Sequence, residues 1–181
     1  TVTGGQTMSK VATTISMSVG ATNTGVLSQV WTVDNAVWSI AENNGVAPCL
    51  EAYVYFNNIP SFYNMHIGVY GQYYGSAGHL LVLQYYDWEE ASWETLRRID
   101  SNTVGKQWYN TTYFKDHDNM IDAGGNAIFR FSHPTNGISS HYLLVDLFVL
   151  EFNILAASTT TTCETTCNTS TYSSTYSTTF C

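Results

Sequence analysis

Charged side chains are scarce in this sequence, and positively charged ones are the scarcest. They make up 11% of its 181 residues, with six Lys or Arg against 14 Asp or Glu and a net charge of −8. Six cations cannot form a surface that follows the phosphates of a nucleic acid, and the same shortage disfavours docking on an anionic membrane. We therefore expect neither nucleic acid nor a membrane surface as a partner.

A long apolar run is also missing. The longest such segment, HYLLVDLFVLEFNILAA at residues 141–157, is interrupted by Asp146 and Glu151. A membrane-spanning helix needs about 20 consecutive apolar residues, so no membrane span is predicted. No signal peptide is visible and the chain opens on Thr1, which is typical of a mature, processed chain or of an artificially trimmed one.

Strong helix formers are few, whereas Tyr, Thr, Ser, Asn and Gly are abundant. This composition favours short strands separated by turns. No convincing helix longer than a turn or two is found, and regular short strands predict an all-β sandwich or barrel. The strands are expected at residues 26–31, 36–40, 50–56, 65–71, 79–86, 93–99, 107–114, 127–132 and 141–152.

Residues 1–25 contain a further strand, SKVATTISMSVG. Its apolar residues alternate with small or polar ones and so lie on one face of a strand. Such a strand can add to the sheet edge of a neighbouring subunit. In that case the docking residues are Val11, Ile15 and Val19.

The order of the strands resembles the galactose-binding-like jelly roll. AGHLLVLQYYDWEEASWETLRRI has an alternating apolar strand, an aromatic-Asp turn, then Trp and a second strand; NAIFRFSHPTNGISSHYLLVDLFVLE follows with IFRF and a late LLVDLFVLE. The resemblance covers about residues 26–152 and implies a jelly-roll β-sandwich domain over residues 26–157. Members of that family bind sugars or serve as structural modules, and they often carry a structural Ca²⁺, so the fold leaves the function open.

Local spacing indicates neither a catalytic nor a zinc site. None of the histidines stands at zinc-ligand spacing from another His or Cys, and CETTC has no second pair. Glu89, Glu90 and Glu94 beside Trp are interpreted as the rim of a turn, so no enzyme is predicted. The histidines are His66, His79, His117, His133 and His141.

One loop offers ligands for a metal ion. In KDHDNMIDAGGN, Asp116, Asp118 and Asp122 could supply the oxygens that Ca²⁺ prefers. An ordinary solvated turn is the alternative, and no other cofactor is expected.

The role of the Tyr-rich strands YVYFNN, VYGQYYG and QYYDW is a second open question, since their rings either stack on sugars or fill the core.

Four cysteines and two N-glycosylation sequons, at Asn110 and Asn168, favour an oxidising, extracellular setting. The four cysteines allow three disulfide pairings. Cys163 and Cys167 could close a tight local turn, whereas an extended tail would put them about 13 Å apart, too far to bridge each other. Cys49 would then meet Cys181, within one chain or between two. The predicted disulfide cysteines are Cys49, Cys163, Cys167 and Cys181.

The last 24 residues, 158–181, form a tail in which 16 residues are Ser or Thr. Such a segment cannot build a core of its own. As an extended strand it would place Tyr172, Tyr176 and Phe180 on one face, ready to dock on a sheet edge. Further glycans are expected on Thr159, Thr160, Thr161 and Thr162.

Together these features predict an extracellular structural subunit. It would assemble head to tail into a filament or surface array, with a terminal strand docked on its neighbour. One alternative is a carbohydrate-binding module of a secreted protein, and another is a viral or phage fibre domain.

Overall fold

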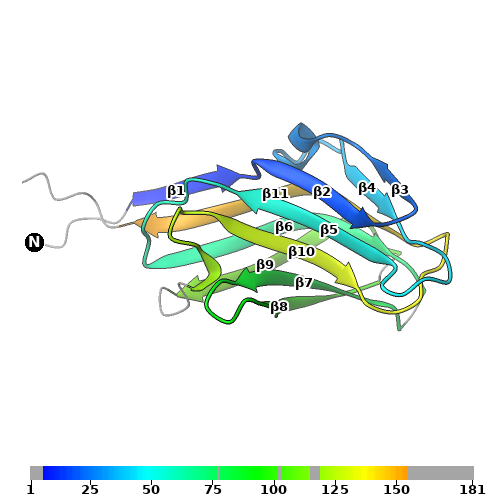
Figure 1. The fold of residues 1–181 in the computed structure, drawn as a ribbon. Helices are drawn as coiled ribbons and strands as arrows, with labels where there is room; N and C mark the ends of the chain where they lie inside the picture. The colour runs from blue at the N-terminus through cyan, green and yellow to red at the C-terminus, as the bar shows by residue number, and fades with distance from the viewer. Residues whose placement is uncertain (1–5, 77, 102, 115–118, 155–181) are drawn as a thin grey trace, which may run out of the picture.

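The computed structural model describes residues 6–76, 78–101, 103–114 and 119–154, and these form two antiparallel β-sheets packed face to face (Figure 1). The chain is an all-β jelly-roll sandwich, as predicted. The tail at 158–181 lies outside the described residues, and with it every glycosylation, disulfide and docking residue predicted there. Within the described part of the chain, no helix is long and apolar enough to cross a membrane.

Six strands form the first sheet, which is called sheet A here. Its order is β3-β4-β11-β6-β9, and β1 pairs with β11 beside that path. These strands are β1 (Gln6–Val11), β3 (Thr22–Thr24), β4 (Trp38–Ala41), β6 (Asn64–Tyr74), β9 (Gln107–Phe114) and β11 (Tyr142–Ile154).

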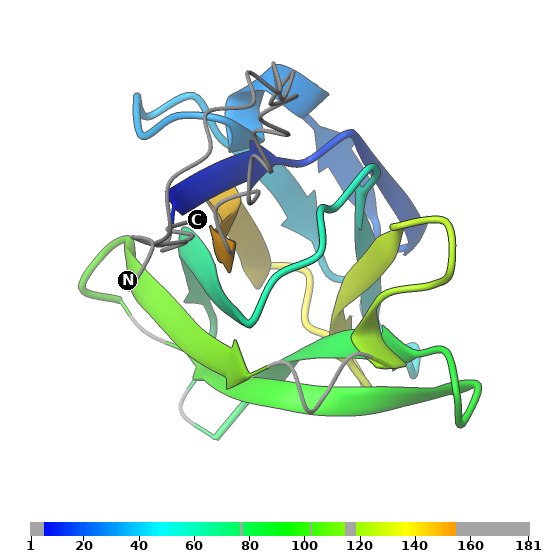
Figure 2. The same cartoon turned by 90° about the vertical axis from the view of Figure 1, so that its left-hand side faces the viewer.

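Five strands form the second sheet, sheet B, in the order β2-β5-β10-β7-β8. Figure 2 shows the two sheets enclosing the core between them. The strands are β2 (Thr14–Val19), β5 (Leu50–Phe56), β7 (Leu80–Asp87), β8 (Ser92–Asp100) and β10 (Ala127–His133).

Successive side chains of each strand point to opposite faces of the sheet, and this alternation determines which residues are buried. In β5, LEAYVYF, every second residue from Leu50 is fully buried, while the residues between them face outward. Phenylalanines from both sheets meet in the core, where the rings of Phe56, Phe129 and Phe148 lie with centroids 5.3–5.7 Å apart. This aromatic contact joins sheet A to sheet B.

The N-terminal segment differs from the prediction of one free donor strand. The chain crosses from sheet A to sheet B at the buried Ala12, so that Val11 pairs with Val149 of β11 whereas Ile15 pairs with Val54 of β5. Both halves therefore already have partners within the chain. The predicted docking residues Val11, Ile15 and Val19 lie on strands of the sandwich itself.

The segment at 26–31 was also predicted to be a strand, and this is wrong. Residues Leu27–Val30 form a short 3₁₀ helix, η1. The Gln29 side chain bends back to accept a hydrogen bond from the Val26 backbone N–H at 2.7 Å, which closes the turn locally. Trp31 then returns to sheet A by a single bridge to Leu147.

Candidate functional site

A hollow of about 380 Å³ lies on the outer face of sheet A, over β11, β6 and β9. Alternation along the strands aims one set of side chains away from the core at this place. Polar and aromatic groups surround a floor of small and aliphatic ones. The lining residues are His66, Ile67, Gly68, Trp108, Asn110, Val149 and Glu151.

The hollow exists because residue 68 has no side chain. A Cβ built on Gly68 would lie 3.0 Å from Val149 Cγ1 and 3.4 Å from Trp108 Cζ3. These distances are at or below ordinary van der Waals contact, so any larger residue fills the space between β11 and β9. Gly68 therefore forms the floor, with side chains from both neighbouring strands as walls.

An aromatic platform stands at one side of this floor. Trp108 is 48% exposed, and its ring centroid lies 5.2 Å from that of its cross-strand partner Tyr70. The Lys106 ammonium lies 5.7 Å from the Tyr70 ring centroid. Tyr70 thus supports the indole from one side and leaves nearly half of the Trp108 surface in solvent.

An ion pair fixes the sheet beside the platform. Asp146 is the extra residue where the register of β11 shifts against β6, and its buried carboxylate pairs with Lys106. The same carboxylate accepts hydrogen bonds from the backbone N–H groups of Asp34 and Asn35 at 3.2 and 3.3 Å. One bulge therefore holds both the Lys106 side chain and the loop at 32–36.

Sheet B also carries aromatic side chains on its outer face, and an arginine lies over one of them, Trp93. The Arg130 guanidinium lies 4.3 Å above the Trp93 ring centroid, where it is held by Glu51 at 3.2 Å and Gln84 at 2.7 Å. Tyr53 packs against the same indole with ring centroids 5.8 Å apart. A planar ligand would have to displace this arginine, so the face of sheet A is the more accessible one.

Of the tyrosines predicted either to stack on sugars or to fill the core, some lie in the core and others on the surface. Tyr73 and Tyr85 are buried in the core, as expected for residues that fill the sandwich. Tyr70 instead lies on the outer face of sheet A, against Trp108. Trp108 and Gly68 were missed, although the alternation of QWYNTTYF puts Trp108 and Asn110 on the face opposite the buried Tyr109.

The sequon residue Asn110 lies within the hollow. Its side chain is exposed on β9, and its Oδ1 would be 3.6 Å from a Cβ at residue 68. Whether it carries a glycan stays a prediction. The position implies that a glycan there would occupy the same space as a ligand.

Three of the acidic residues singled out in the sequence, Asp122, Glu89 and Glu90, lie in turns. Asp122 accepts hydrogen bonds from the backbone N–H groups of Gly124 and Asn126 and from the Asn126 amide, at 2.7–2.9 Å. These bonds hold the pKa of Asp122 below its usual range. Asp116 and Asp118 lie outside the described residues, so the Ca²⁺ site stays a prediction. Glu89 and Glu90 lie in the turn after β7, capped through their N–H groups by Asp87.

A second polar cluster lies inside the sandwich, at the end where several strands stop. The fully buried Glu42 follows β4 and accepts hydrogen bonds from the Tyr73 hydroxyl and the Ile138 N–H, the latter at 2.9 Å. His133 Nδ1 lies 2.7 Å from the same carboxylate. Burial alone would raise the pKa of Glu42, but these hydrogen bonds outweigh it and lower the pKa to about 2.

Cys49 belongs to this cluster. Its side chain is fully buried, and its Sγ lies 2.8 Å from His133 Nδ1. Burial, followed by the charge of Glu42, raises the pKa of Cys49 to about 12. The predicted bridge from Cys49 to the tail stays a prediction, because its partner cysteines lie outside the described residues.

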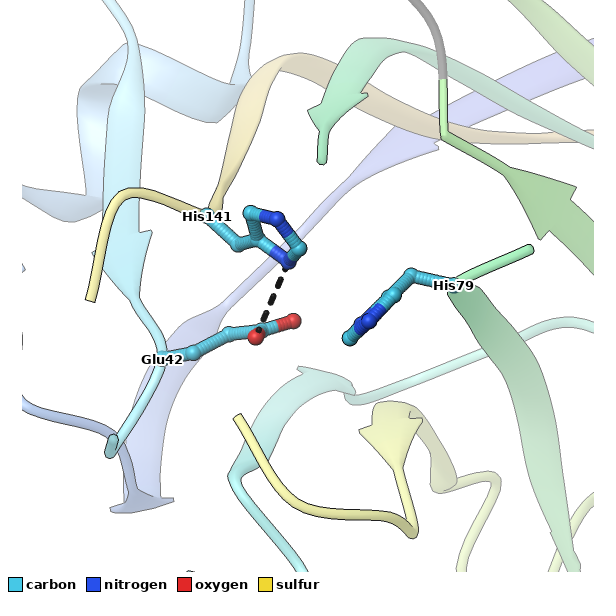
Figure 3. Close-up of side chains that lie close together, drawn as sticks. All are labelled: Glu42, His79 and His141. Carbon is cyan, nitrogen blue, oxygen red and sulfur yellow. Dashed lines mark ion pairs between the residues drawn. The ribbon is translucent and has the colours of Figure 1, made fainter. Parts of the chain in front are cut away.

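Histidines complete the cluster, although their sequence spacing predicted no metal site. His79 precedes β7, His133 ends β10 and His141 precedes β11. His141 is almost wholly buried, and burial, opposed in part by Glu42, lowers its pKa. The Glu42 carboxylate and the rings of His79 and His141 turn toward one another (Figure 3).

No protein-family model matches the chain, and no curated protein matches it by sequence. Solved structures do match in fold. A xylan-binding module CBM15 aligns with a TM-score of 0.54 at 9% identity, covering 84% of this chain and all of that one. The CBM22-1 xylan-binding domain from Paenibacillus barcinonensis Xyn10C aligns with a TM-score of 0.52 at 10% identity, covering 86% and 100%.

The CBM29-2 module, a family 29 carbohydrate-binding module, aligns with a TM-score of 0.50 at 12% identity and covers 83% of this chain and 94% of that one. All three are jelly-roll β-sandwiches, which confirms the resemblance predicted from the strand order. The described chain therefore has the fold of the jelly-roll carbohydrate-binding modules.

Proposed function

We propose that this domain binds a polysaccharide chain on the outer face of sheet A, in the hollow above Gly68. The observation that carries the proposal is the half-exposed Trp108 standing beside a floor without a side chain. A pyranose ring has apolar C–H faces that stack on an indole, and its hydroxyls need hydrogen-bonding groups at the rim. Asn110, His66 and Glu151 line the hollow and supply such groups.

The length of this surface and the net charge of the chain indicate which class of ligand fits the site. From Gly68 to Tyr74 the outward side of β6 extends over roughly 20 Å, at about 3.3 Å per residue, with Gln72 between them covered. Tyr74 and Tyr142 stack at its far end with ring centroids 4.9 Å apart. A site of this length suits an oligosaccharide more than a single sugar. The net charge of −8 favours a neutral polysaccharide over a polyanionic one.

Similar folds in xylan-binding modules make xylan the first ligand to test, with cellulose-type glucans second. The proposed role is binding without catalysis, in an extracellular setting. We prefer it to head-to-tail self-assembly through the N-terminal segment, because both N-terminal strands already pair within the chain; docking through the tail at 158–181 involves residues outside the described part and stays a prediction. That pairing leaves the N-terminal segment without the free strand that docking on a neighbour requires.

The test is calorimetric titration of the native chain with xylo- and cello-oligosaccharides of increasing length. We expect the affinity to rise with length up to a plateau. Trp108→Ala should weaken binding at least about tenfold, because a truncated aromatic anchor typically costs 2 kcal/mol or more. The matched control is Trp88→Ala, which removes another exposed tryptophan, in the turn after β7. Equal affinity in both variants would contradict the proposal.

A further inference from the structure

Glu42, His79 and His141 come from three strand ends that are far apart in the sequence, and they offer one oxygen and two nitrogens to a common space (Figure 3). One potential ligand atom from each residue lies within 4.8 Å of the other two. We propose that these three residues bind a zinc ion at this end of the sandwich. The inference is independent of the sugar-binding hollow, which lies on the outer face of sheet A.

The spacing of the atoms matches a metal site better than a hydrogen bond. His141 Nδ1 lies 3.4 Å from Glu42 Oε2, without hydrogen-bonding geometry. Two ligand atoms of a tetrahedral zinc ion with bonds of about 2.0–2.1 Å stand roughly 3.3–3.4 Å apart. The observed separation is compatible with an ion between the two groups.

Unsatisfied nitrogens point to the same conclusion. Within the described part of the chain, His79 Nδ1 and His141 Nδ1 are buried atoms with no hydrogen-bond partner. An unpaired buried polar atom is unfavourable, and these two belong to residues that cluster with one carboxylate. A cation bound by these nitrogens would satisfy both and would also neutralise the carboxylate.

The carboxylate is held in place by groups that would form an outer shell. Glu42 Oε1 is bonded by the Tyr73 hydroxyl and by His133, whereas Oε2, within the described part of the chain, accepts the Ile138 N–H and faces His141. Oε2 therefore keeps a lone pair for the ion. Metal sites commonly use such second-shell bonds to orient a carboxylate or imidazole ligand.

The Ser76 backbone N–H donates a hydrogen bond to the outer nitrogen of His141, Nε2, at 3.0 Å, and the Ser76 hydroxyl lies 3.1 Å from it. Nε2 is therefore the acceptor in this arrangement, and the ring proton is on Nδ1. When Nδ1 binds a metal, Nε2 carries the proton and donates it, and the Ser76 hydroxyl can accept. The Ser76 backbone N–H must then turn away. Zinc binding should therefore shift the loop between β6 and β7, which also carries His79.

The chemical type of the three ligand groups indicates which metal ion they would bind. Two imidazoles and one carboxylate suit zinc among the redox-inert ions, whereas Ca²⁺ and Mg²⁺ require oxygen ligands almost throughout. The partly exposed loop before β7 provides a route for the ion to enter. Once bound, the ion would connect the ends of β4, β7 and β11 and so act as a structural clip.

The experiment uses the full chain after chelator treatment, titrated with zinc chloride and followed by calorimetry and metal analysis. We expect one tight equivalent per chain. His79→Gln and His141→Gln should each weaken it more than about 100-fold, because loss of a second-shell group alone costs 10–100-fold. Tyr73→Phe, which removes such a group, should fall in that smaller range.

Three controls make the result decisive. Glu89→Gln removes an exposed carboxylate in the turn after β7 and should leave the zinc affinity unchanged. Cys163→Ser with Cys167→Ser should also leave it unchanged, which excludes binding to the tail. Cobalt in place of zinc should show the visible bands of a tetrahedral ion without a thiolate charge-transfer band.

Either of two outcomes would overturn the proposal: no stoichiometric binding by the native chain, or equal affinity in His79→Gln. If His141→Gln does not fold, His79→Gln decides alone, because His79 lies on a partly exposed loop where substitution should be tolerated.

Discussion

Tyr70 on β6 and Trp108 on β9 face each other as a cross-strand pair on the outer face of sheet A, with their ring planes inclined by 44°. The pairing holds the indole upright at the edge of the Gly68 hollow. Neither residue is close to the other in the sequence, so the platform exists only in this register. The binding proposal can therefore be tested by changes that leave the register intact.

Filling the hollow should abolish binding without unfolding the domain. Gly68→Leu places a side chain where even a Cβ already touches Val149 and Trp108. We expect oligosaccharide affinity to fall at least about tenfold, with Gly68→Ala intermediate. Thermal unfolding measured on the same samples should change little, because the added side chain points away from the core. If Gly68→Leu instead lost much of its stability and kept its affinity for oligosaccharide, this would contradict binding in the hollow.

Glycosylation at Asn110 should compete with ligand binding. The sequon asparagine lines the hollow, so a glycan attached there would cover Trp108. Chain made in a glycosylating host and carrying that glycan should bind oligosaccharide poorly, and enzymatic removal of the glycan should restore binding. Asn110→Gln produced in the same host separates the effect of the glycan from that of the amide. Equal binding with and without the glycan would place the ligand elsewhere.

Removing the Lys106 ammonium should destabilise the fold beside the platform. Lys106→Met leaves the buried Asp146 carboxylate with only two backbone donors, from Asp34 and Asn35. We expect a loss of about 1–3 kcal/mol in the free energy of unfolding, measured by urea denaturation. Lys10→Met, on β1, serves as the control and should change it by less than about 0.5 kcal/mol.

Phe148 should be among the most costly residues to truncate. It is fully buried and contacts Phe56, Phe129 and Phe131, with ring centroids 5.3–6.0 Å away. Phe148→Ala should lower the free energy of unfolding by about 3–5 kcal/mol through lost contacts and a cavity. Phe148→Leu should cost clearly less, and the two are compared by chemical denaturation. A similar cost for both would show that the site collapses around the smaller side chain.

Asp122 should titrate below its usual range. Hydrogen bonds from Asn126, first from its amide and then from its backbone N–H, favour the charged carboxylate. Because the folded pKa is lowered, the stabilising contribution is present above the unfolded value and is lost as the pH falls through the folded value. Carboxyl-carbon NMR should show this, and Asn126→Ala should raise the Asp122 pKa. An unchanged pKa in that variant would assign the shift to another group.

Much of the sandwich could be predicted from alternation alone. The strands at 50–56 and 107–114 have the predicted bounds, since their period-two pattern leaves one choice of buried face. The error at 26–31 has a local cause, because the Gln29 side chain closes a 3₁₀ turn that residue-type preferences do not reveal. At Ala12 the apolar pattern continues unbroken although the chain changes sheets, so periodicity could not show the crossing.

The sites were harder to predict because they depend on pairing between distant strands. Trp108 and Gly68 meet only through the register of β6 against β9. Glu42, Cys49, His79, His133 and His141 lie at the ends of different strands, and no motif spacing connects them. A sequence search for neighbouring ligands therefore rejects a cluster that the jelly-roll topology assembles.

The antiparallel pairing of β1 with β11, which sets Gln6 opposite Ile154, has a mechanical consequence. Both ends of the described chain leave the sandwich on the same side (Figure 1). A force that separates residues 6 and 154 would open the hydrogen bonds between these strands one after another, as in unzipping, instead of loading them all together in shear. The domain should therefore begin to unfold at low force when it is pulled by residues 6 and 154. A force transmitted through a bound polysaccharide would instead act on the middle strands of sheet A.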